Sequence, residues 1–207
     1  WKTIDPEKFE INYFMGNPDE VWELFIKNFA LGQEIKPNEA HLALAELERI
    51  KLLCGIMTQN IDGLHQKAGS INVIELHGNL ERAVCIDCEK SYPLNEIIKN
   101  FTGKSPHCPS CGGLLKPDII FFGEPLKQEV ITKAVELAKA SDVFLAIGTS
   151  LSVSPANQLP LYAKMNGAKL IIINEGPTEE DELADIIIRG RVESILPEIV
   201  KVIKSKL

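Results

Sequence analysis

Two pairs of cysteines constrain the fold of this chain more than any other feature. Cys85-x-x-Cys88 and Cys108-x-x-Cys111 are separated by 19 residues. Each pair fits a tight turn that presents two thiolates to one ion, and four thiolates are typical of a closed, tetrahedral structural zinc site. Two disulfides or an iron–sulfur cluster are the alternatives. The spacing therefore predicts a small zinc-bearing module whose metal has no open position for chemistry.

The charge of this module bears on its function, because many zinc ribbons bind nucleic acid. Residues 81–118 contain five basic and five acidic side chains, and the whole chain carries a net charge of −7. Binding to phosphates requires a cationic surface, so we expect no direct nucleic-acid partner. His107 lies next to Cys108 and could replace a cysteine as ligand, but the complete quartet makes that substitution unnecessary.

Outside the module, apolar strands alternate with amphipathic helices. This pattern predicts an α/β fold with a parallel sheet covered by helices on both faces. We expect helices over 17–29, 37–47, 63–68, 128–140, 156–166 and 192–204, and strands over 52–57, 73–76, 143–147, 169–173 and 186–188. Cys54 lies in the first of these strands and is expected to be a buried, small apolar residue.

The predicted domains follow from these segments. We expect a sheet domain formed by residues 1–79, including a helical region at 17–50, and by residues 119–207, with residues 80–118 inserted as the zinc ribbon. No apolar run is long enough to span a membrane and no secretory leader opens the chain, so we expect a cytoplasmic protein without a membrane partner.

Polar residues follow three of the predicted strands, where open α/β sheets bind their ligands. The clusters are Thr58–His65, Gly148–Ser152 and Asn174–Gly176. Hydroxyl, amide and carboxylate groups at these positions could bind a ribose or a carboxamide, although strand-to-helix turns also favour the same residues for structural reasons alone.

His77-Gly78 follows the strand at 73–76. An imidazole at a strand end is a candidate general base near neutral pH, and a histidine hydrogen-bonded within a packed loop is the structural alternative. His41 and His65 fall on predicted helices and are interpreted as structural or surface groups.

Taken together, these motifs resemble the sirtuin family of NAD-dependent protein deacylases over nearly the whole chain. The resemblance lies in Thr58-Gln59-Asn60-Ile61-Asp62-Gly63-Leu64-His65, Leu76-His77-Gly78, the cysteine quartet, Lys116-Pro117-Asp118-Ile119-Ile120-Phe121-Phe122-Gly123-Glu124, Gly148-Thr149-Ser150-Leu151 and Ile173-Asn174. It implies a Rossmann-like NAD domain with a small zinc-ribbon domain, and a substrate peptide bound in the cleft between them.

The resemblance also implies a reaction and a set of roles. The acyl oxygen of an acyl-lysine attacks C1′ of the nicotinamide ribose, nicotinamide leaves, and His77 activates a ribose hydroxyl that takes over the acyl group. Asn60 and Asp62 act with His77 as catalytic residues. The residues implied to bind NAD are Gln59, Asn60, Ile61, Asp62, Gly148, Thr149, Ser150, Asn174 and Val192. Those implied to bind the substrate backbone, as a strand, are Ile119, Ile120, Phe122, Gly123 and Glu124.

Two departures from the family pattern matter. Family members begin with a strand and a glycine-rich loop that holds the NAD pyrophosphate, whereas this sequence opens at Trp1, which resembles a Trp just beyond that region; we expect the segment before it to be missing from this sequence. Relatives that remove succinyl or malonyl groups carry a Tyr and an Arg where this chain has Phe25 and Asn28. Since neither residue can bind an acyl carboxylate as a cation does, we expect a preference for neutral acyl groups.

Two other functions compete with deacylation. One is a non-catalytic interaction module built from the zinc ribbon and the Rossmann-like domain. The other is a mono-ADP-ribosyltransferase, which would share the NAD site.

Overall fold

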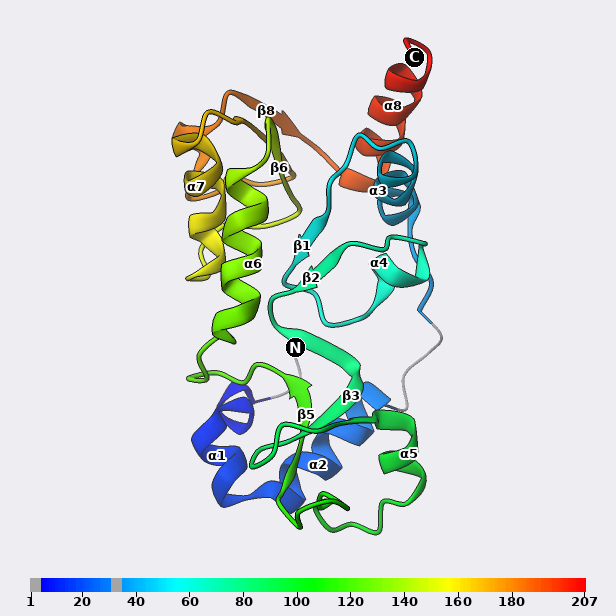
Figure 1. The fold of residues 1–207 in the computed structure, drawn as a ribbon, viewed down its shortest axis with the longest axis vertical. Helices are drawn as coiled ribbons and strands as arrows, with labels where there is room; N and C mark the ends of the chain where they lie inside the picture. Colours follow the sequence, from blue (N-terminus) through cyan, green and yellow to red (C-terminus); the bar gives the residue numbers. More distant parts are fainter. Residues whose placement is uncertain (1–4, 31–34) are drawn as a thin grey trace. The chain divides into compact units, whose positions relative to one another are not determined.

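The computed structural model describes residues 5–30 and 35–207 (Figure 1). The chain divides into two compact units. The cysteine unit comprises Trp1–Ile35, Asn60–Gly63 and His77–Leu126, and the sheet unit comprises Lys36–Gln59, Leu64–Leu76 and Lys127–Leu207. Among the described residues, no helix is both long and apolar enough to cross a membrane.

The sheet unit contains two parallel sheets. One pairs β1 (Ile56–Thr58) with β2 (Val73–Glu75), and the other has the order β6 (Val143–Ile147), β7 (Lys169–Asn174), β8 (Ile186–Arg189). Parallel strands covered on both faces are near-continuous apolar runs, as Val143–Ile147 and Leu170–Ile173 are. The predicted parallel α/β architecture is therefore confirmed.

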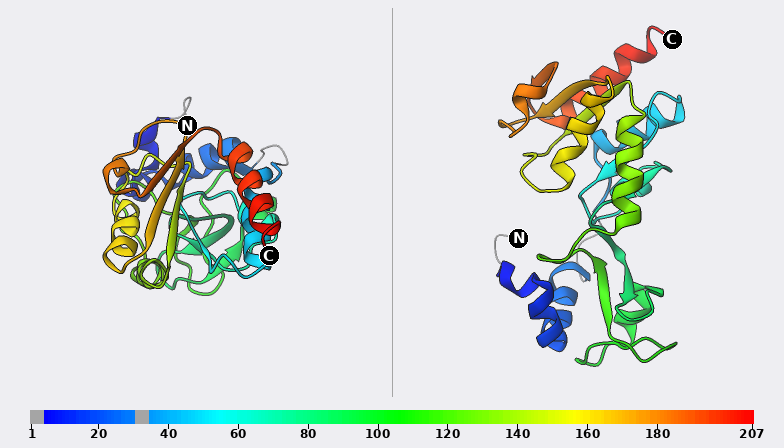
Figure 2. Two further views of the ribbon diagram at one scale, coloured as in Figure 1. Left: turned by 90° about the horizontal axis from the view of Figure 1, so that it is seen from above. Right: turned by 60° about the vertical axis from the view of Figure 1, so that its left-hand side comes forward.

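Helices cover both faces of these strands (Figure 2). The helical elements are α3 (Glu39–Arg49), α4 (Leu64–Lys67), α6 (Gln128–Lys139), η3 (Ala156–Gln158), α7 (Leu159–Met165), η4 (Asp181–Leu183) and α8 (Val192–Lys204). α3 and α8 share a core with Ile56 and Ile173, whereas α6 and α7 pack against Met57 and Phe144. Because side chains alternate along a strand, neighbouring residues such as Ile56 and Met57 serve opposite cores.

The cysteine unit is built on an antiparallel sheet of order β4 (Ser91–Pro93), β3 (Gly78–Cys85), β5 (Leu115–Ile119). Its helical elements are η1 (Pro6–Phe9), α1 (Ile11–Gly16), α2 (Pro18–Phe25), η2 (Ile26–Ala30) and α5 (Leu94–Lys99). One apolar core joins these helices to the sheet: Phe9 and Phe14 make edge-to-face contacts with Phe121, and the buried Trp22 donates from Nε1 to the Leu115 carbonyl at 2.9 Å.

This packing differs from the expected domain boundaries. Residues 6–30 lie with the cysteine-bearing sheet, whereas the sequence grouped 1–79 with the parallel sheet. Large aromatic side chains account for this difference, because Phe9 and Phe14 pack against Phe121 and the Trp22 indole is hydrogen-bonded to Leu115 of β5, all within the core of the cysteine unit. The division at 79/80 and 118/119 itself stays a prediction.

Several local expectations are corrected. The strand expected over 52–57 begins only at Ile56, because Lys51 adopts a left-handed conformation and the Leu52 and Leu53 N–H groups both donate to the Leu47 carbonyl at the end of α3. Cys54 therefore lies outside the strand and is exposed, so its interpretation as a buried residue is wrong. The helix expected over 156–166 is divided into η3 and α7, since Pro160 in the first turn of α7 lacks an N–H.

Candidate active site and metal centre

The four predicted metal ligands lie together at one end of the cysteine unit. Their Sγ atoms all fall within 4.8 Å of one another, with Cys85 and Cys111 3.5 Å apart and Cys88 and Cys108 3.7 Å apart. A tetrahedron with zinc–sulfur bonds of about 2.3 Å has edges of roughly 3.8 Å. All four thiols are free of disulfides. The residues present therefore fit a single tetrahedral zinc ion.

The backbone explains why these sulfurs converge. Each Cys-x-x-Cys turn, called a knuckle below, is closed by the fourth residue after its first cysteine. This residue is Glu89 in the first knuckle and Gly112 in the second. It has a left-handed backbone conformation, and its N–H donates to the carbonyl of Cys85 or Cys108, respectively. Gly113 follows the second knuckle, and a Cβ there would lie 2.9 Å from the Cys85 sulfur. A side chain at 113 would thus occupy the space in which the ligands meet.

The thiols influence one another strongly. The hydroxyl of Tyr92, 3.1 Å from the Cys108 sulfur, is the main reason that the pKa of Cys108 falls to about 6. The Gly113 N–H lowers the pKa of Cys111, but hydrogen bonds with the neighbouring thiols outweigh it and raise that pKa to about 12. Four thiolates so close together require a cation, which zinc supplies.

His107 is not part of this cluster. Its Nδ1 lies 3.0 Å from the Gly112 carbonyl oxygen, and residue 107 forms an isolated antiparallel bridge with Leu114. The ring therefore supports the second knuckle through the backbone, and the quartet needs no fifth ligand.

His77 lies at a sharp corner between β2 and β3. Its carbonyl accepts the Ile120 N–H at 3.0 Å, and its side chain is half-buried. Gly78 next to it has φ +82°, and a Cβ there would lie 1.9 Å from the Asp118 carbonyl oxygen. Only glycine allows β3 to approach β5 so closely at this point, so the corner holds His77 in a defined place.

The segment Asn60–Gly63 is attached to the same strand. The Ile61 carbonyl accepts the Leu80 N–H at 2.8 Å, and Gly63, with φ +68°, turns the chain beside Asn79 and Glu81. Asp62 is half-buried and Asn60 is exposed. The three expected catalytic residues, His77, Asn60 and Asp62, thus belong to one unit and are fixed to the first residues of β3.

The expected substrate-binding strand is shorter than the sequence indicated. β5 ends at Ile119; within residues 120–124, Phe122 forms an isolated parallel bridge with Glu10 and a turn follows at Gly123. The Phe122 N–H donates to the Phe9 carbonyl, and its own carbonyl accepts the Ile11 N–H, so residues 9–11 already pair with this residue. Phe122 is nevertheless 56% exposed. An extended strand over the whole of 119–124 is therefore wrong.

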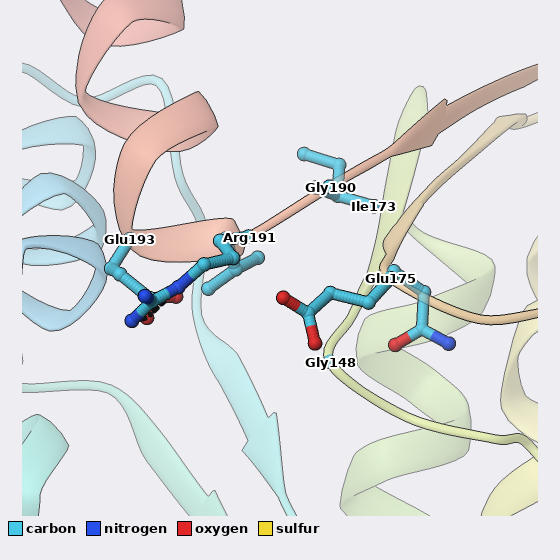
Figure 3. A pocket seen from close by; sticks show the side chains of 8 residues that line it. Gly148, Ile173, Glu175, Gly190, Arg191 and Glu193 are labelled. Carbon is cyan, nitrogen blue, oxygen red and sulfur yellow. Dashed lines mark hydrogen bonds and ion pairs between the residues drawn. The ribbon is translucent and has the colours of Figure 1, made fainter.

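A pocket of about 580 Å³ opens at the carboxyl ends of β6 and β7 in the sheet unit (Figure 3). Three of the residues expected to bind NAD, Gly148, Asn174 and Val192, line it. Gly148 turns away from β6 with φ +60°, and its N–H donates to the Ile173 carbonyl at 2.9 Å. The Asn174 side chain donates to the Gly176 carbonyl at 3.0 Å.

The other expected NAD-binding residues do not line this pocket. Thr149 and Ser150 follow Gly148 in a turn that their own side chains shape: Thr149 Oγ1 accepts the Leu151 N–H at 3.1 Å, and Ser150 Oγ lies 2.8 Å from Ser152 Oγ. Gln59 directly follows β1, and Ile61 is attached to β3.

Glu175, from the expected polar cluster Asn174–Gly176, also lines the pocket, and sequence reasoning missed Gly190, Arg191 and Glu193, which line it too. The Nε of Arg191 donates to the Glu193 carboxylate at 2.9 Å, and one terminal nitrogen donates to the same oxygen. Figure 3 shows this pair on one side of the pocket and the Glu175 carboxylate extending toward it from the other. The position of the missed residues in the sequence could have identified them, because they lie next to Val192 and directly follow the end of β8.

The remaining candidates are structural. His41 caps α3 through Asn38, and its ring lies 4.8 Å from that of His65 on α4, as the helical placement of both residues predicted. Phe25 is fully buried, and the Asn28 side chain donates to the Leu24 carbonyl at 2.7 Å. Trp1 lies outside the described residues.

Comparison with known proteins gives consistent results. The model of the Sir2 family matches residues 2–155. An NAD-dependent protein deacetylase of Pyrobaculum aerophilum is 56% identical over 207 residues, covering 100% of this chain and 82% of that protein. A Sir2 homolog–NAD complex superposes with a TM-score of 0.90 at 35% identity, covering 100% of this chain and 80% of the other. A Sir2 structure bound to an acetylated peptide gives 0.88 at 37% identity, covering 95% and 83%.

Proposed function

Because the chain belongs to the Sir2 family, we propose that it is an NAD-dependent protein-lysine deacylase that transfers the acyl group to ADP-ribose and releases nicotinamide. The fold is the Rossmann-like α/β domain of that family with a module whose four clustered cysteines fit a zinc ion. The observation that supports this chemistry best is the corner at His77, where the histidine and the segment with Asn60 and Asp62 are fixed to one strand. The relatives are described as deacetylases, so we set aside the interaction module and the ADP-ribosyltransferase.

In this proposal His77 is the general base. Its imidazole takes the proton of a ribose hydroxyl as that oxygen attacks the acyl carbon, a role that side chains of this type commonly perform near neutral pH. Asp62 and Asn60 orient the nicotinamide and its ribose through carboxylate and amide hydrogen bonds. Gln59, Ile61, Thr149 and Ser150 complete the NAD contacts, together with the pocket residues Gly148, Asn174 and Val192. Cys85, Cys88, Cys108 and Cys111 would hold a zinc ion with all four coordination positions filled, so the metal would stabilise the module and would leave no open position for chemistry.

The substrate is an acylated lysine in a protein or peptide. We assign its binding to Ile119, Ile120, Phe122, Gly123 and Glu124, supported by two features of that segment. It begins at the end of β5, and Ile120 is hydrogen-bonded to the carbonyl of His77. The exposed Phe122 ring offers an apolar surface to the lysine side chain.

The acyl group is expected to be neutral. Phe25 is buried and Asn28 is hydrogen-bonded to its own helix, so these positions offer no cation to a carboxylate. An acetylated peptide should therefore react faster than its succinylated counterpart; faster turnover of the succinyl peptide would contradict this assignment.

We place the protein in the cytoplasm, without a nucleic-acid or membrane partner. Four thiols gathered in one metal-type cluster favour a reducing compartment. The balanced charge of residues 81–118 offers no cationic surface for phosphates.

His77→Ala tests the function. We expect steady-state formation of the deacetylated peptide from NAD and an acetylated peptide to fall by at least about 100-fold, because general-base catalysis contributes that much to the step that follows nicotinamide release. Zinc content and melting temperature should stay at the wild-type values, which would show that the fold is intact. A variant that folds, binds zinc and keeps the full rate would contradict the mechanism.

A further inference from the structure

Asn79 buries a carboxamide beside the corner that holds His77, and the proposed function assigns this side chain no role. It is the second residue of β3 (Figure 1), and only 3% of it is exposed. Burying an amide costs free energy unless its polar atoms are hydrogen-bonded. Asn79 Oδ1 accepts the Glu81 N–H at 2.7 Å, which closes an Asx turn inside the strand. The path of β3 and the conformation of this side chain are therefore fixed together.

The Asx turn coincides with an irregularity of the antiparallel sheet. β3 pairs with β5 at Gly78 and again from Ala83, and the register shifts between these two residues. Irregularities of this kind bend a strand and redirect its groups. Within this stretch the Leu80 N–H donates to the Ile61 carbonyl at 2.8 Å. The irregular part of β3 thus holds the Asn60–Gly63 segment through its backbone.

The side chains of the Asx turn contact the same segment. A Cβ on Gly63 would lie 3.6 Å from Asn79 Nδ2 and 3.4 Å from a Glu81 carboxylate oxygen. Asn79 and Glu81 are two positions apart on the strand, so both side chains point to the same side. Gly63 is buried and has φ +68°, a conformation that favours glycine. Asp62 therefore lies between two fixed residues, Ile61 and Gly63.

We propose that Asn79 is a positioning residue for the deacylation, and that its Asx turn fixes the Asn60–Gly63 segment relative to His77. Gly78 alone separates His77 from Asn79, and its close approach to β5 fixes that connection. The inference rests on the proposed function, which assigns the nicotinamide and its ribose to this segment. Asn79 itself touches neither NAD nor the peptide in this assignment, and it acts through the segment that does.

Asn79→Ala tests this role, because it removes the acceptor of the Glu81 N–H. We expect nicotinamide release, measured in a single turnover with saturating NAD and acetylated peptide, to slow at least about tenfold, since a displacement of roughly 1 Å at a reacting group can cost about 100-fold. The dissociation constant for the acetylated peptide, measured by calorimetry, should stay within about twofold, because uniform binding of the peptide is not altered. Zinc content and melting temperature show whether the variant is folded.

Asn79→Ser is the conservative variant, because a serine hydroxyl accepts the N–H two residues ahead in the same kind of turn. It should recover most of the rate of nicotinamide release. The matched control is Asn100→Ala, which removes a carboxamide that donates to the Glu96 carbonyl at the end of α5. This variant should release nicotinamide at the wild-type rate.

An unchanged rate in Asn79→Ala would overturn the inference while leaving the proposed function standing. The same conclusion would follow if affinity for the peptide fell together with the rate, or if the serine variant were as slow as the alanine variant, since Asn79 would then only stabilise the fold. Failure of the wild type to deacetylate the peptide would instead overturn the proposed function, and the inference with it.

Discussion

The Lys116 side chain carries a positive charge although only 6% of its surface is exposed. Its ammonium donates to the Ile119 carbonyl and to the Glu124 carboxylate at 2.9 Å, and it lies 4.8 Å from the centre of the Phe121 ring. The same carboxylate oxygen accepts the Phe121 N–H. One buried charge therefore joins both ends of the segment that we assign to the substrate.

Lys116→Met should loosen that segment, because it leaves Glu124 without its counter-ion. We expect the KM for an acetylated peptide to rise about tenfold while the KM for NAD changes little, and the free energy of unfolding to fall by roughly 3 kcal/mol, as when one partner of a largely buried ion pair is removed. Steady-state kinetics with each substrate varied in turn, together with urea unfolding, measure both effects.

Lys116→Arg is the matched comparison, since it keeps the charge and should recover most of the peptide KM. A loss of stability with an unchanged peptide KM would show that Lys116 stabilises the fold without positioning the segment.

At the scale of the elements, the knuckles hold the ends of the antiparallel sheet. Cys85 is the last residue of β3, and the second knuckle immediately precedes β5. The buried Trp22 reports on that sheet, because its Nε1 donates to the first residue of β5. Metal binding and the packing of α2 are thus connected through a single strand.

Removal of zinc by a strong chelator should therefore shift the Trp22 fluorescence to longer wavelength, because the indole becomes hydrated when β5 loosens. The measurement is made on a Trp1→Phe chain, so that Trp22 is the single indole that emits, with zinc measured by atomic absorption at about one per chain before treatment. Adding zinc back should restore the spectrum.

Cys88→Ser should show the shifted spectrum without chelator, whereas Cys54→Ser, which changes an exposed thiol outside the cluster, should behave like the wild type. An unshifted spectrum in a chain shown to contain no zinc would contradict the structural role of the metal.

At the scale of the whole molecule, the parts that the sequence predicted are those with an unambiguous local signal. The apolar run Val143–Ile147 and the amphipathic stretch Val192–Lys204 match β6 and α8 residue for residue. The cysteine quartet was readable because ligand spacing is imposed by the geometry of the metal. His77 was marked as a candidate by its position beside a glycine at a strand end.

The parts that the sequence did not predict depend on contacts between distant residues. Helices within 6–16 form because Phe9 and Phe14 pack against Phe121, more than 100 positions away. Arg191 and Glu193 were missed since charges after a strand are usually solvated, and only the fold brings them beside Glu175 and Asn174.

The response of the whole fold to acid follows from two carboxylates of the sheet unit. Lys164, the Leu170 N–H and Lys169 all donate to Asp185, so its pKa lies well below the usual 3.8. Arg49 and Lys204 together lower the pKa of Glu46 to about 2, which connects α3 to α8. The ionised forms of Asp185 and Glu46 therefore stabilise the folded chain.

Since these pKa values are lower in the folded than in the unfolded chain, the stabilisation is complete above about pH 4.5 and is lost as the pH falls toward 2. Urea unfolding at pH 7, 5, 4 and 3 should show a free energy of unfolding that falls at the acid end of this range. Asp185→Asn should be less stable at pH 7 but lose less between pH 5 and 3, because the titrating group is gone. Glu198→Gln, at an exposed position on α8, should follow the wild type. If the stability of Asp185→Asn fell as steeply with pH as that of the wild type, protonation of other groups would cause the loss. The contacts of Asp185 with α7 and β7 would then not determine the pH dependence of the free energy of unfolding.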